Sequence, residues 1–181
     1  MDKRNEKPPS EDPFAFFWKA LSGHHKYKVI SKPICQKGDK DCNVFNVYAT
    51  TLESNQNIAP TTSTDPVTDG STVPISYSGG GTIKTTIDRE NLSVTNETLP
   101  GHPLYPGTVT RMTRELPSGD IVEVTEGTGE GIFPRFNEFA APVVWSLPDS
   151  QLRQAWKTKP AKGKEGDSSK FKFDPSKEDD L

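Results

Sequence analysis

The chain has 181 residues, of which 31% are hydrophobic and 26% charged, and its mean hydropathy is -0.70. A composition this polar cannot build one closely packed globule from end to end, so we expect a single domain with loosely structured ends. The formal net charge of -3 and the pI near 5.7 argue against a general nucleic-acid coat protein, because binding many phosphates requires clustered Lys and Arg.

The first segment, residues 1–31, joins a charged, proline-containing leader to an aromatic patch at residues 14–21. Asp12 and Pro13 are typical of a helix start and Gly23 of a helix end, so the sequence predicts a short helix between them. The aromatic side chains require burial, either in the domain's own core or in a partner or carrier protein. No apolar stretch follows the basic start, and no run approaches about eighteen apolar residues, so we expect neither a signal peptide nor a membrane span.

The second segment, residues 32–81, contains both cysteines and a polar stretch. Cys35 and Cys42 flank a turn-like run at 38–41, so a disulfide between them is geometrically acceptable. Two reduced thiols are the preferred interpretation for a chain kept in the cytoplasm, whereas export through a dedicated secretion machine would favour the disulfide. Residues 52–78 are rich in Thr, Ser, Asn, Asp and Pro, and we predict a long loop or linker there because they bury little apolar surface.

The third segment, residues 82–157, is predicted to be the folded core, and it belongs to the α+β class. Its strands are expected where β-branched residues are frequent, at residues 82–87, 92–99, 108–116 and 120–126. Turn residues at the two hairpin positions, 88–91 and 117–119, favour a twisted antiparallel sheet of about four strands.

Short helices are expected to pack on one face of this sheet, and the chain ends are expected to be disordered. The first helix, at 136–141, would be stopped by Pro142, and the second would begin at Asp149 and run through Trp156. The last segment, residues 158–181, is rich in Lys, Gly, Ser and Asp and is predicted to be a disordered tail.

A histidine in a loop rich in Pro and Gly is the strongest candidate for chemistry. His102 lies in a rigid loop before a predicted strand, and an unperturbed imidazole with a pKa of about 6.5 changes charge near neutral pH. Arg111 on that strand is suited to binding a phosphate, Glu126 at the end of the next strand to acting as the complementary base, and Thr128 to donating a hydrogen bond. Antiparallel pairing of the two strands would bring His102 and Glu126 to the same edge of the sheet.

Each of these residues also has a purely structural interpretation. His102 can satisfy a backbone group in its own turn, and Arg111 can pair across strands with Glu123 or Glu126. The glycines at 127, 129 and 131 do not open a helix, so a bulge or tight turn is favoured over a nucleotide-binding loop. The pair His24 and His25, which lies beside lysines, is predicted to be in a solvated loop. No metal or cofactor site is expected.

Several short motifs together resemble C-terminal toxin-like domains of bacterial secreted effectors, the modules that end polymorphic toxins and are delivered by contact-dependent or type VI or IV secretion. These motifs are PIC at 33–35, CNVF at 42–45, TNET at 95–98, GHPL at 101–104, GTVTR at 107–111, EGTGEG at 126–131 and Trp145. The family pattern carries a His before the glycine-containing turn, where this chain has Glu126, and this departure counts against a mechanism with two histidines.

The resemblance implies a toxin that leaves the producing cell without a signal peptide and acts inside a target cell, together with a cognate immunity protein and a secretion carrier or chaperone. Metal-independent cleavage of RNA is the chemistry that the candidate residues favour, because it requires a base for the 2′-hydroxyl, an acid for the leaving 5′-oxygen and a cation for the phosphate. Two alternatives stay open. One is a toxin with different chemistry, on the cell wall or a nucleotide, and the other is an interaction module without catalysis.

Overall fold

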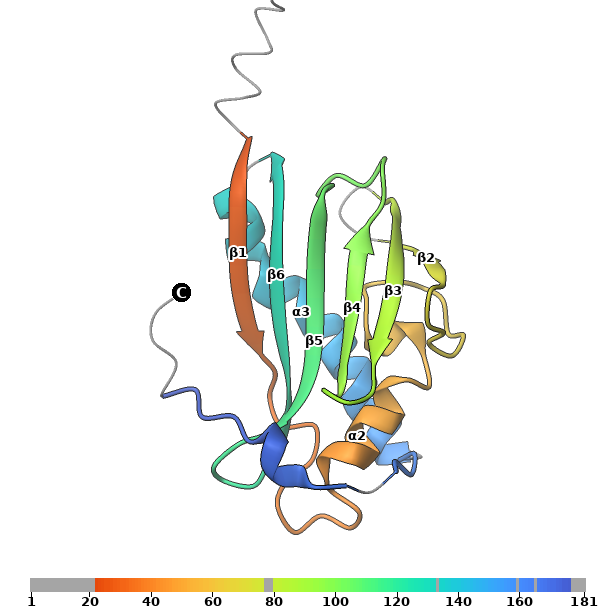
Figure 1. The fold of residues 1–181 in the computed structure, drawn as a ribbon, viewed down its shortest axis with the longest axis vertical. Helices are drawn as coiled ribbons and strands as arrows, with labels where there is room; N and C mark the ends of the chain where they lie inside the picture. Colours follow the sequence, from red (N-terminus) through yellow and green to blue (C-terminus); the bar gives the residue numbers. More distant parts are fainter. Residues whose placement is uncertain (1–21, 77–79, 133, 159, 165, 177–181) are drawn as a thin grey trace, which may run out of the picture.

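A six-stranded antiparallel sheet lies at the centre of the fold, with strand order β1-β6-β5-β4-β3-β2 (Figure 1). The strands are β1 (Ser22–Ile30), β2 (Thr72–Pro74), β3 (Thr82–Asp88), β4 (Ser93–Thr98), β5 (Gly107–Glu115) and β6 (Ile121–Ile132). The computed structural model describes all residues except 1–21, 77–79, 133, 159, 165 and 177–181, so the helix predicted at 14–21 lies outside the described residues. The predicted α+β class with an antiparallel sheet is confirmed, but the sheet has six strands and not about four.

The two central hairpins form where turn residues predicted them. β3 pairs with β4 and β5 pairs with β6, both antiparallel. In the first turn, the Asp88 carboxylate accepts hydrogen bonds from the backbone N–H of Glu90 and Asn91, each 3.0 Å long. In the second, the backbone N–H of Gly119 donates to the Leu116 carbonyl oxygen. These local hydrogen bonds satisfy the turn backbone and fix the register of each hairpin.

β1 pairs with β6 along its whole length, in a segment that was expected to be a solvated loop. The prediction of a bulge or tight turn at the β6 glycines is wrong, because Gly127 and Gly129 pair regularly with both neighbouring strands. A Cβ atom on Gly127 would overlap the Tyr27 ring, and one on Gly129 would lie 3.0 Å from the His25 ring. The glycines therefore leave space for two β1 aromatic rings to lie across β6.

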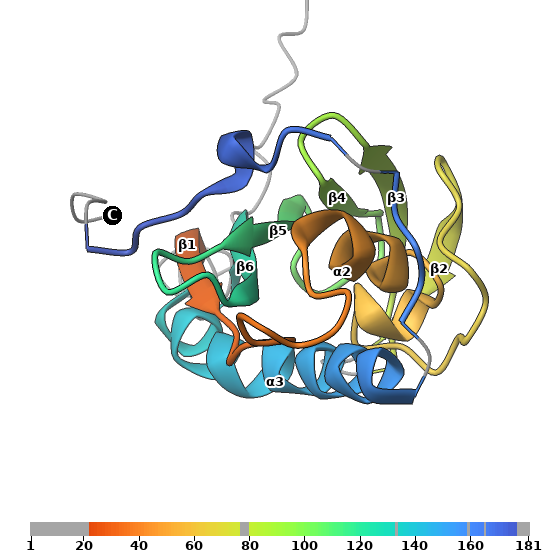
Figure 2. The ribbon, with the colours of Figure 1, turned by 90° about the horizontal axis from the view of Figure 1, so that it is seen from below.

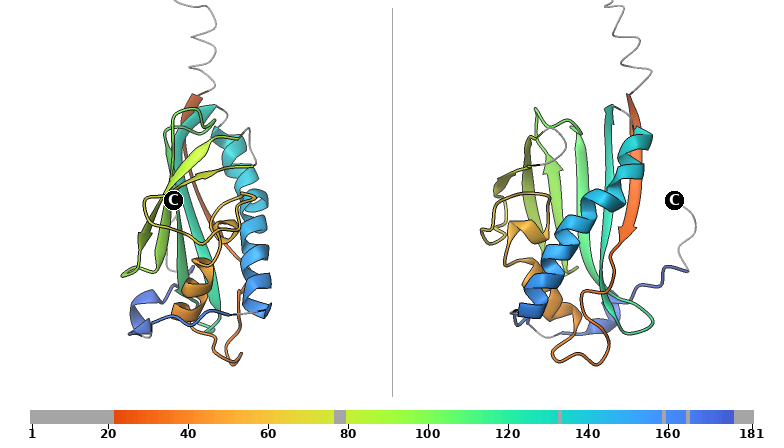
Figure 3. Two further views of the ribbon diagram at one scale, coloured as in Figure 1. Left: turned by 90° about the vertical axis from the view of Figure 1, so that its right-hand side faces the viewer. Right: turned by 180° about the vertical axis from the view of Figure 1, so that it is seen from behind.

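The helix α3 (Pro134–Thr158) crosses one face of the sheet diagonally (Figure 3). It is one continuous helix, so the predicted stop at Pro142 is wrong. Each proline inside the helix removes a backbone donor, but burial of an amphipathic stripe offsets this loss. The stripe consists of Ala141, Trp145, Leu152 and Trp156, all at most 7% exposed. We call the face under α3 the inner face and the opposite one the outer face.

The segment expected to be a linker is folded onto the core. Helix α2 (Val44–Thr51) and the 3-10 turn η1 (Asn55–Asn57) open it, and β2 extends the sheet edge. Ile58 is completely buried, and Val73 is 3% exposed. Sparse apolar residues thus suffice here because the sheet and α3 supply the rest of the core.

Most of the tail predicted to be disordered also packs on the body of the protein. Residues 160–164 and 166–176, which we call the C-terminal strap, pass from the end of α3 around α2 and across the lower end of the sheet (Figure 2). The strap contains the 3-10 helix η2 (Ser168–Phe171), whose Phe171 ring meets the Phe45 ring edge-on at 5.7 Å. The backbone N–H of Phe173 donates to the Glu115 carbonyl oxygen, which joins the strap to β5.

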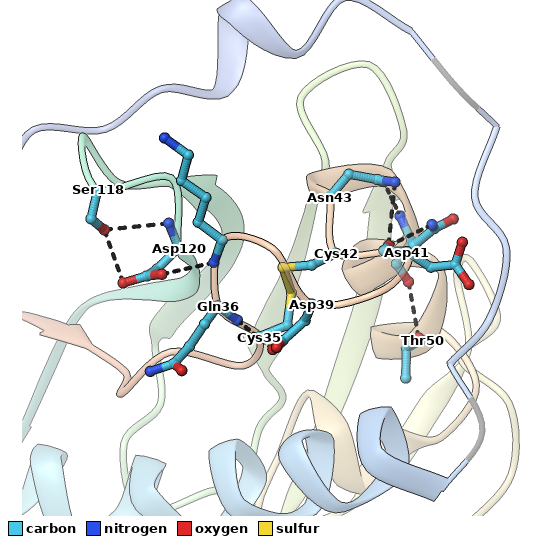
Figure 4. The surroundings of a disulfide bond; sticks show 11 residues. Cys35, Gln36, Asp39, Asp41, Cys42, Asn43, Thr50, Ser118 and Asp120 are labelled. Atoms are coloured by element: carbon cyan, nitrogen blue, oxygen red, sulfur yellow. Dashed lines mark hydrogen bonds between the residues drawn. A yellow bond between two sulfur atoms is a disulfide. The ribbon is translucent and has the colours of Figure 1, made fainter.

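Cys35 and Cys42 form a disulfide, so the preferred interpretation of two reduced thiols is wrong (Figure 4). Cys35 forms a backbone bridge to Ile121 at the start of β6, and Cys42 directly precedes Asn43, which caps α2. The Asp120 carboxylate accepts a hydrogen bond from the backbone N–H of Lys37 within the closed loop. The disulfide therefore joins the starts of β6 and α2.

Within the described part of the chain, no helix has the length and apolar character needed to cross a membrane.

Candidate functional site

Arg111 lies on the inner face and is 1% exposed, so it is enclosed between the sheet and α3. Its guanidinium donates to the Asp149 carboxylate at 2.8 Å and to the Thr125 hydroxyl at 2.9 Å, and it lies 5.4 Å from the centre of the Trp145 ring. Its partner is therefore Asp149 on α3, and neither Glu123 nor Glu126. This arrangement holds α3 against the sheet and leaves no access for a phosphate.

The inner face around Arg111 carries further buried polar groups. Glu123 is 1% exposed, and its carboxylate accepts a hydrogen bond of 2.6 Å from the Thr113 hydroxyl. Burial raises the pKa of Glu123, while nearby Arg111 and the Thr113 hydrogen bond oppose this rise. The Trp145 indole N–H donates to the Tyr27 hydroxyl at 3.0 Å. These contacts engage the Glu123 carboxylate and the Trp145 indole within the protein, whereas the Arg111 Nε and the His25 Nδ1 are buried without a hydrogen-bond partner among the described residues.

His102 lies in the β4–β5 loop and makes its contacts within that loop. Its Nδ1 accepts a hydrogen bond of 3.1 Å from the backbone N–H of Leu104. The imidazole also packs on Gly81, where a Cβ atom would lie 2.7 Å from the ring. Burial lowers the pKa of His102, so the side chain favours its neutral form. These contacts are those of a histidine that satisfies a backbone group in its own turn.

The predicted four-residue site does not assemble. Arg111 pairs in register with Thr125, so it shares the inner face with Thr125, whereas Glu126 must point to the outer face. His102 contacts Gly81 at the start of β3, and β3 is three strand spacings from β6, about 14 Å. Glu126 is also not at a strand end, because β6 continues to Ile132.

Two of the four residues do share a surface. Glu126 and Thr128 both lie on the outer face of β6, and Thr128 is exposed. Along one face of a strand, alternate residues are about 7 Å apart. The Glu126 carboxylate forms an ion pair of 3.0 Å with the Lys28 ammonium group, and its side chain remains 45% exposed. This carboxylate is therefore positioned and still accessible to solvent.

β1 brings a histidine and lysines to the same surface. The His24 Nε2 lies 3.3 Å from the Thr128 hydroxyl oxygen, and Lys26 stands directly opposite Thr128 in the pairing. His24 and Lys26 are both exposed. Among the described residues, the Lys26 side chain has no ion-pair partner, while Lys28 also lies 5.1 Å from the centre of the Phe173 ring.

We call these five residues the outer-face cluster: His24, Lys26, Lys28, Glu126 and Thr128. Figure 1 looks onto this face, and no described helix lies over its upper part. The cluster combines an imidazole, a carboxylate, ammonium groups and a hydroxyl within two neighbouring strands. Such a set can move protons and bind an anion.

Sequence reasoning missed the three β1 members of the cluster because it interpreted their segment as a loop. A usable signal was present, since large apolar or aromatic side chains alternate with polar ones from His24 to Val29. Alternation with a period of two is typical of a strand that has one covered face. The position of this strand at the sheet edge beside β6 could not be predicted in the same way, because it depends on pairing between segments about one hundred residues apart.

No protein-family model matches this chain, and no curated protein matches it. Among solved structures, it is similar to protein MLL2253 from Mesorhizobium loti, with a TM-score of 0.50 and 14% identity over 75% of this chain and 98% of that chain. It is also similar to the major latex-like protein 151 of Panax ginseng, with a TM-score of 0.47 and 14% identity over 77% of this chain and 99% of that chain. The likeness to MLL2253 shows a shared fold alone.

Proposed function

We propose that this protein is a secreted bacterial toxin effector that cleaves RNA without a metal ion, and that the reaction takes place on the outer-face cluster. One observation carries the proposal: the contact between His24 and Thr128 lies beside the ion pair between Glu126 and Lys28, on a part of the sheet face that no described helix covers. The sequence motifs shared with toxin-like domains support the biological setting.

The proposed reaction uses an acid and a base on either side of one phosphodiester. Glu126 takes the proton of the 2′-hydroxyl, and the 2′-oxygen attacks phosphorus. The bond from phosphorus to the 5′-oxygen breaks, and protonated His24 supplies the proton to this leaving oxygen. The products are a 2′,3′-cyclic phosphate and a free 5′-hydroxyl, so protons and bonds balance.

The other members of the cluster bind the phosphate. Lys26 offers an ammonium group between the acid and the base, and the Thr128 hydroxyl donates a hydrogen bond to a phosphate oxygen. The spacing of about 7 Å between alternate residues on β6 leaves room for one phosphate group. His102 and Arg111 have no role in this version of the site.

The proposal extends to partners and location. The toxin passes from the producer's cytoplasm into a target cell without a signal peptide, with help from a secretion carrier or chaperone. The disulfide between Cys35 and Cys42 suits passage through an oxidising environment. A cognate immunity protein would inhibit the toxin by covering the outer face over β1 and β6.

The test is induced expression in a bacterial cytoplasm, with growth and total RNA integrity followed together. The wild type is expected to arrest growth and degrade RNA, and His24→Ala and Glu126→Gln are each expected to lower the cleavage rate of the purified protein by about 100-fold or more. Cleavage in the presence of a chelator, with products ending in 2′,3′-cyclic phosphate, would support the metal-independent route.

Two matched variants serve as controls. Glu97→Gln changes an exposed carboxylate on the outer face of β4, away from the cluster, and is expected to leave cleavage unchanged. His102→Ala is expected to remain toxic.

Three outcomes would contradict the proposal as stated. Loss of cleavage in His102→Ala with full activity in His24→Ala would indicate that the site lies in the β4–β5 loop. Healthy cells with intact RNA, whatever the variant, would overturn the ribonuclease proposal, and toxicity only after periplasmic targeting would favour a cell-wall target.

A further inference from the structure

A cavity of about 290 Å³ lies far from the outer-face cluster, at the lower end of the fold. Its walls come from α2, the β3–β4 turn and the C-terminal strap. The lining residues that define its chemistry are Phe45, Tyr48, Leu52, Leu92, Arg89 and Lys164. Its volume is just below the usual range for small-molecule sites, which is about 300–1,000 Å³, so it suits a small ligand.

The floor of the cavity is apolar and fixed. Leu92 is 4% exposed and Tyr48 is 5% exposed. The Tyr48 hydroxyl donates to the carbonyl oxygens of Asp88 and Ser93, both at 3.1 Å. Burial raises the pKa of Tyr48 to about 12, so the phenol stays neutral and its hydroxyl is already engaged. The floor therefore offers a ring-sized apolar surface and no charge.

The C-terminal strap forms one wall of the cavity and is held against α2 by hydrogen bonds. The backbone N–H of Ala161 donates to the Thr50 hydroxyl at 2.9 Å, and that of Gly163 donates to the Asn46 side-chain oxygen at 2.8 Å. Gly163 also lies so close to the Phe45 backbone that any side chain there would collide with it. A preformed wall of this kind lowers the cost of ordering the site when a ligand binds.

Two cations on the rim have no ion-pair partner in the described part of the chain. Arg89 and Lys164 are both exposed, and among the described residues neither side chain has an ion-pair or hydrogen-bond partner. A third cation of the lining, Lys162, is already paired with Asp41. An apolar floor beneath two unpaired cations matches a ligand that has an apolar ring or short chain and one negatively charged group.

We propose that this cavity binds a small organic anion, with its apolar body on Tyr48 and Leu92 and its charged group between Arg89 and Lys164. The site is separate from the outer-face cluster and does not depend on ribonuclease activity. Its occupant would bridge α2, the β3–β4 turn and the strap, so binding would also stabilise the strap against local opening.

The test compares two fluorescent probes that differ in charge. The first, 1-anilinonaphthalene-8-sulfonate, carries a sulfonate on an apolar body, and the second, N-phenyl-1-naphthylamine, has the same body without the charge. The paired substitution Arg89→Gln with Lys164→Gln is expected to weaken binding of the sulfonate about tenfold and to change binding of the neutral probe less than about twofold. The charge-matched control is the paired substitution Lys32→Gln with Lys84→Gln, at two exposed lysines outside the cavity, and it is expected to bind both probes normally.

A second variant tests the position of the bound probe. Ala49→Phe fills the cavity from α2, and in a variant whose thermal melting matches the wild type, both probes are expected to lose binding. The proposal is overturned if the rim variant binds the sulfonate as tightly as the wild type, if it weakens both probes equally, or if folded Ala49→Phe binds both probes normally. None of these readouts depends on RNA cleavage, so failure here and failure of the proposed function are distinguishable.

Discussion

Single buried side chains join α3 to the sheet and carry most of the charge inside the protein. Arg111 reaches from β5 to Asp149 on α3, and both side chains are at most 7% exposed. Both charges of a buried ion pair lose their hydration, and this cost offsets most of the attraction between them. The intact pair therefore adds little net stability, although each charge requires the other. Removal of either charge would leave the other buried and uncompensated, which is why Arg111 is a structural residue.

Glu123 adds a second carboxylate beside this pair and gives the protein a specific dependence on pH. Because burial raises its folded-state pKa, the folded protein binds a proton more tightly than the unfolded chain does. The contribution of Glu123 to the free energy of unfolding therefore falls as pH rises from about 4.5, the pKa of an unshifted glutamate, up to the raised folded-state pKa. Asp88, whose pKa is lowered in the folded protein, has the opposite effect. Its contribution to the free energy of unfolding decreases as pH falls.

Glu123→Gln isolates this contribution. The substitution keeps an oxygen that can accept the Thr113 hydrogen bond and removes the titrating proton. We expect the stability of Glu123→Gln relative to the wild type to increase as pH rises above about 4.5, as measured by urea unfolding at a series of pH values. Glu97→Gln, an exposed carboxylate, should show no comparable change. A difference that stays constant with pH would mean that Glu123 is not buried as described.

At the scale of elements, the position of β1 beside the central hairpins depends on contacts between residues that are far apart in the sequence. β1 completes the sheet by placing the Tyr27 ring over Gly127, and the Tyr27 hydroxyl then accepts a hydrogen bond from Trp145 on α3. The disulfide between Cys35 and Cys42 fixes the next connection, from β1 to α2. The strand, the helix and the disulfide loop thus constrain one another.

Replacement of both cysteines by serine tests the contribution of the disulfide. The bond joins residues seven positions apart, and closing a loop of this size removes chain entropy from the unfolded state worth about 2–3 kcal/mol. We expect Cys35→Ser with Cys42→Ser to lose about that much stability in chemical denaturation. The wild type under reducing conditions should approach the variant. Equal stability of the oxidised wild type and the variant would contradict this role.

At the scale of the whole molecule, the C-terminal strap joins the two faces of the fold. It leaves α3 on the inner side, passes α2 and ends against β5 near the outer face (Figure 2). Phe171 is its main apolar contact, at 6% exposure, and the Arg114 guanidinium lies 5.9 Å from the centre of the Phe171 ring. The Lys172 side chain also pairs with Glu115, but Lys172 is 61% exposed.

Phe171→Ala is expected to release the strap. Loss of a buried phenylalanine costs about 3 kcal/mol, so amide hydrogens of residues 166–176 should exchange faster, while those of β4 and β5 stay protected. Lys172→Ala removes only an exposed ion pair and is expected to cost less than about 1 kcal/mol. Hydrogen exchange followed by mass spectrometry measures both. Unchanged exchange of the strap in Phe171→Ala would show that Phe171 does not anchor it.

The central sheet could be predicted because its signals are local. The strands β3 to β6 are rich in β-branched residues, and Asp88–Asn91 and Pro117–Gly119 supply the turns between them. The residues of the candidate site could be predicted only in part from local signals. Glu126 and Thr128 are two residues apart and share the outer face of β6, whereas the choice of His102 as the partner of Glu126 rested on the Pro/Gly character of its loop. His24 lies about one hundred residues earlier in the chain and joins them only through the pairing of β1 with β6.

The sequence by itself determined the α+β class and the two central hairpins, because β-propensity and turn residues act over a few neighbouring residues. Only the tertiary structure decided which face each side chain occupies. A shift of β6 by one residue relative to β5 would bring Glu126 opposite Arg111 on the inner face, and the register of β5 with β6 is set by what the inner face can bury. Long-range packing likewise decided that two prolines do not interrupt α3 and that the polar segments at 52–76 and 160–176 lie on the core.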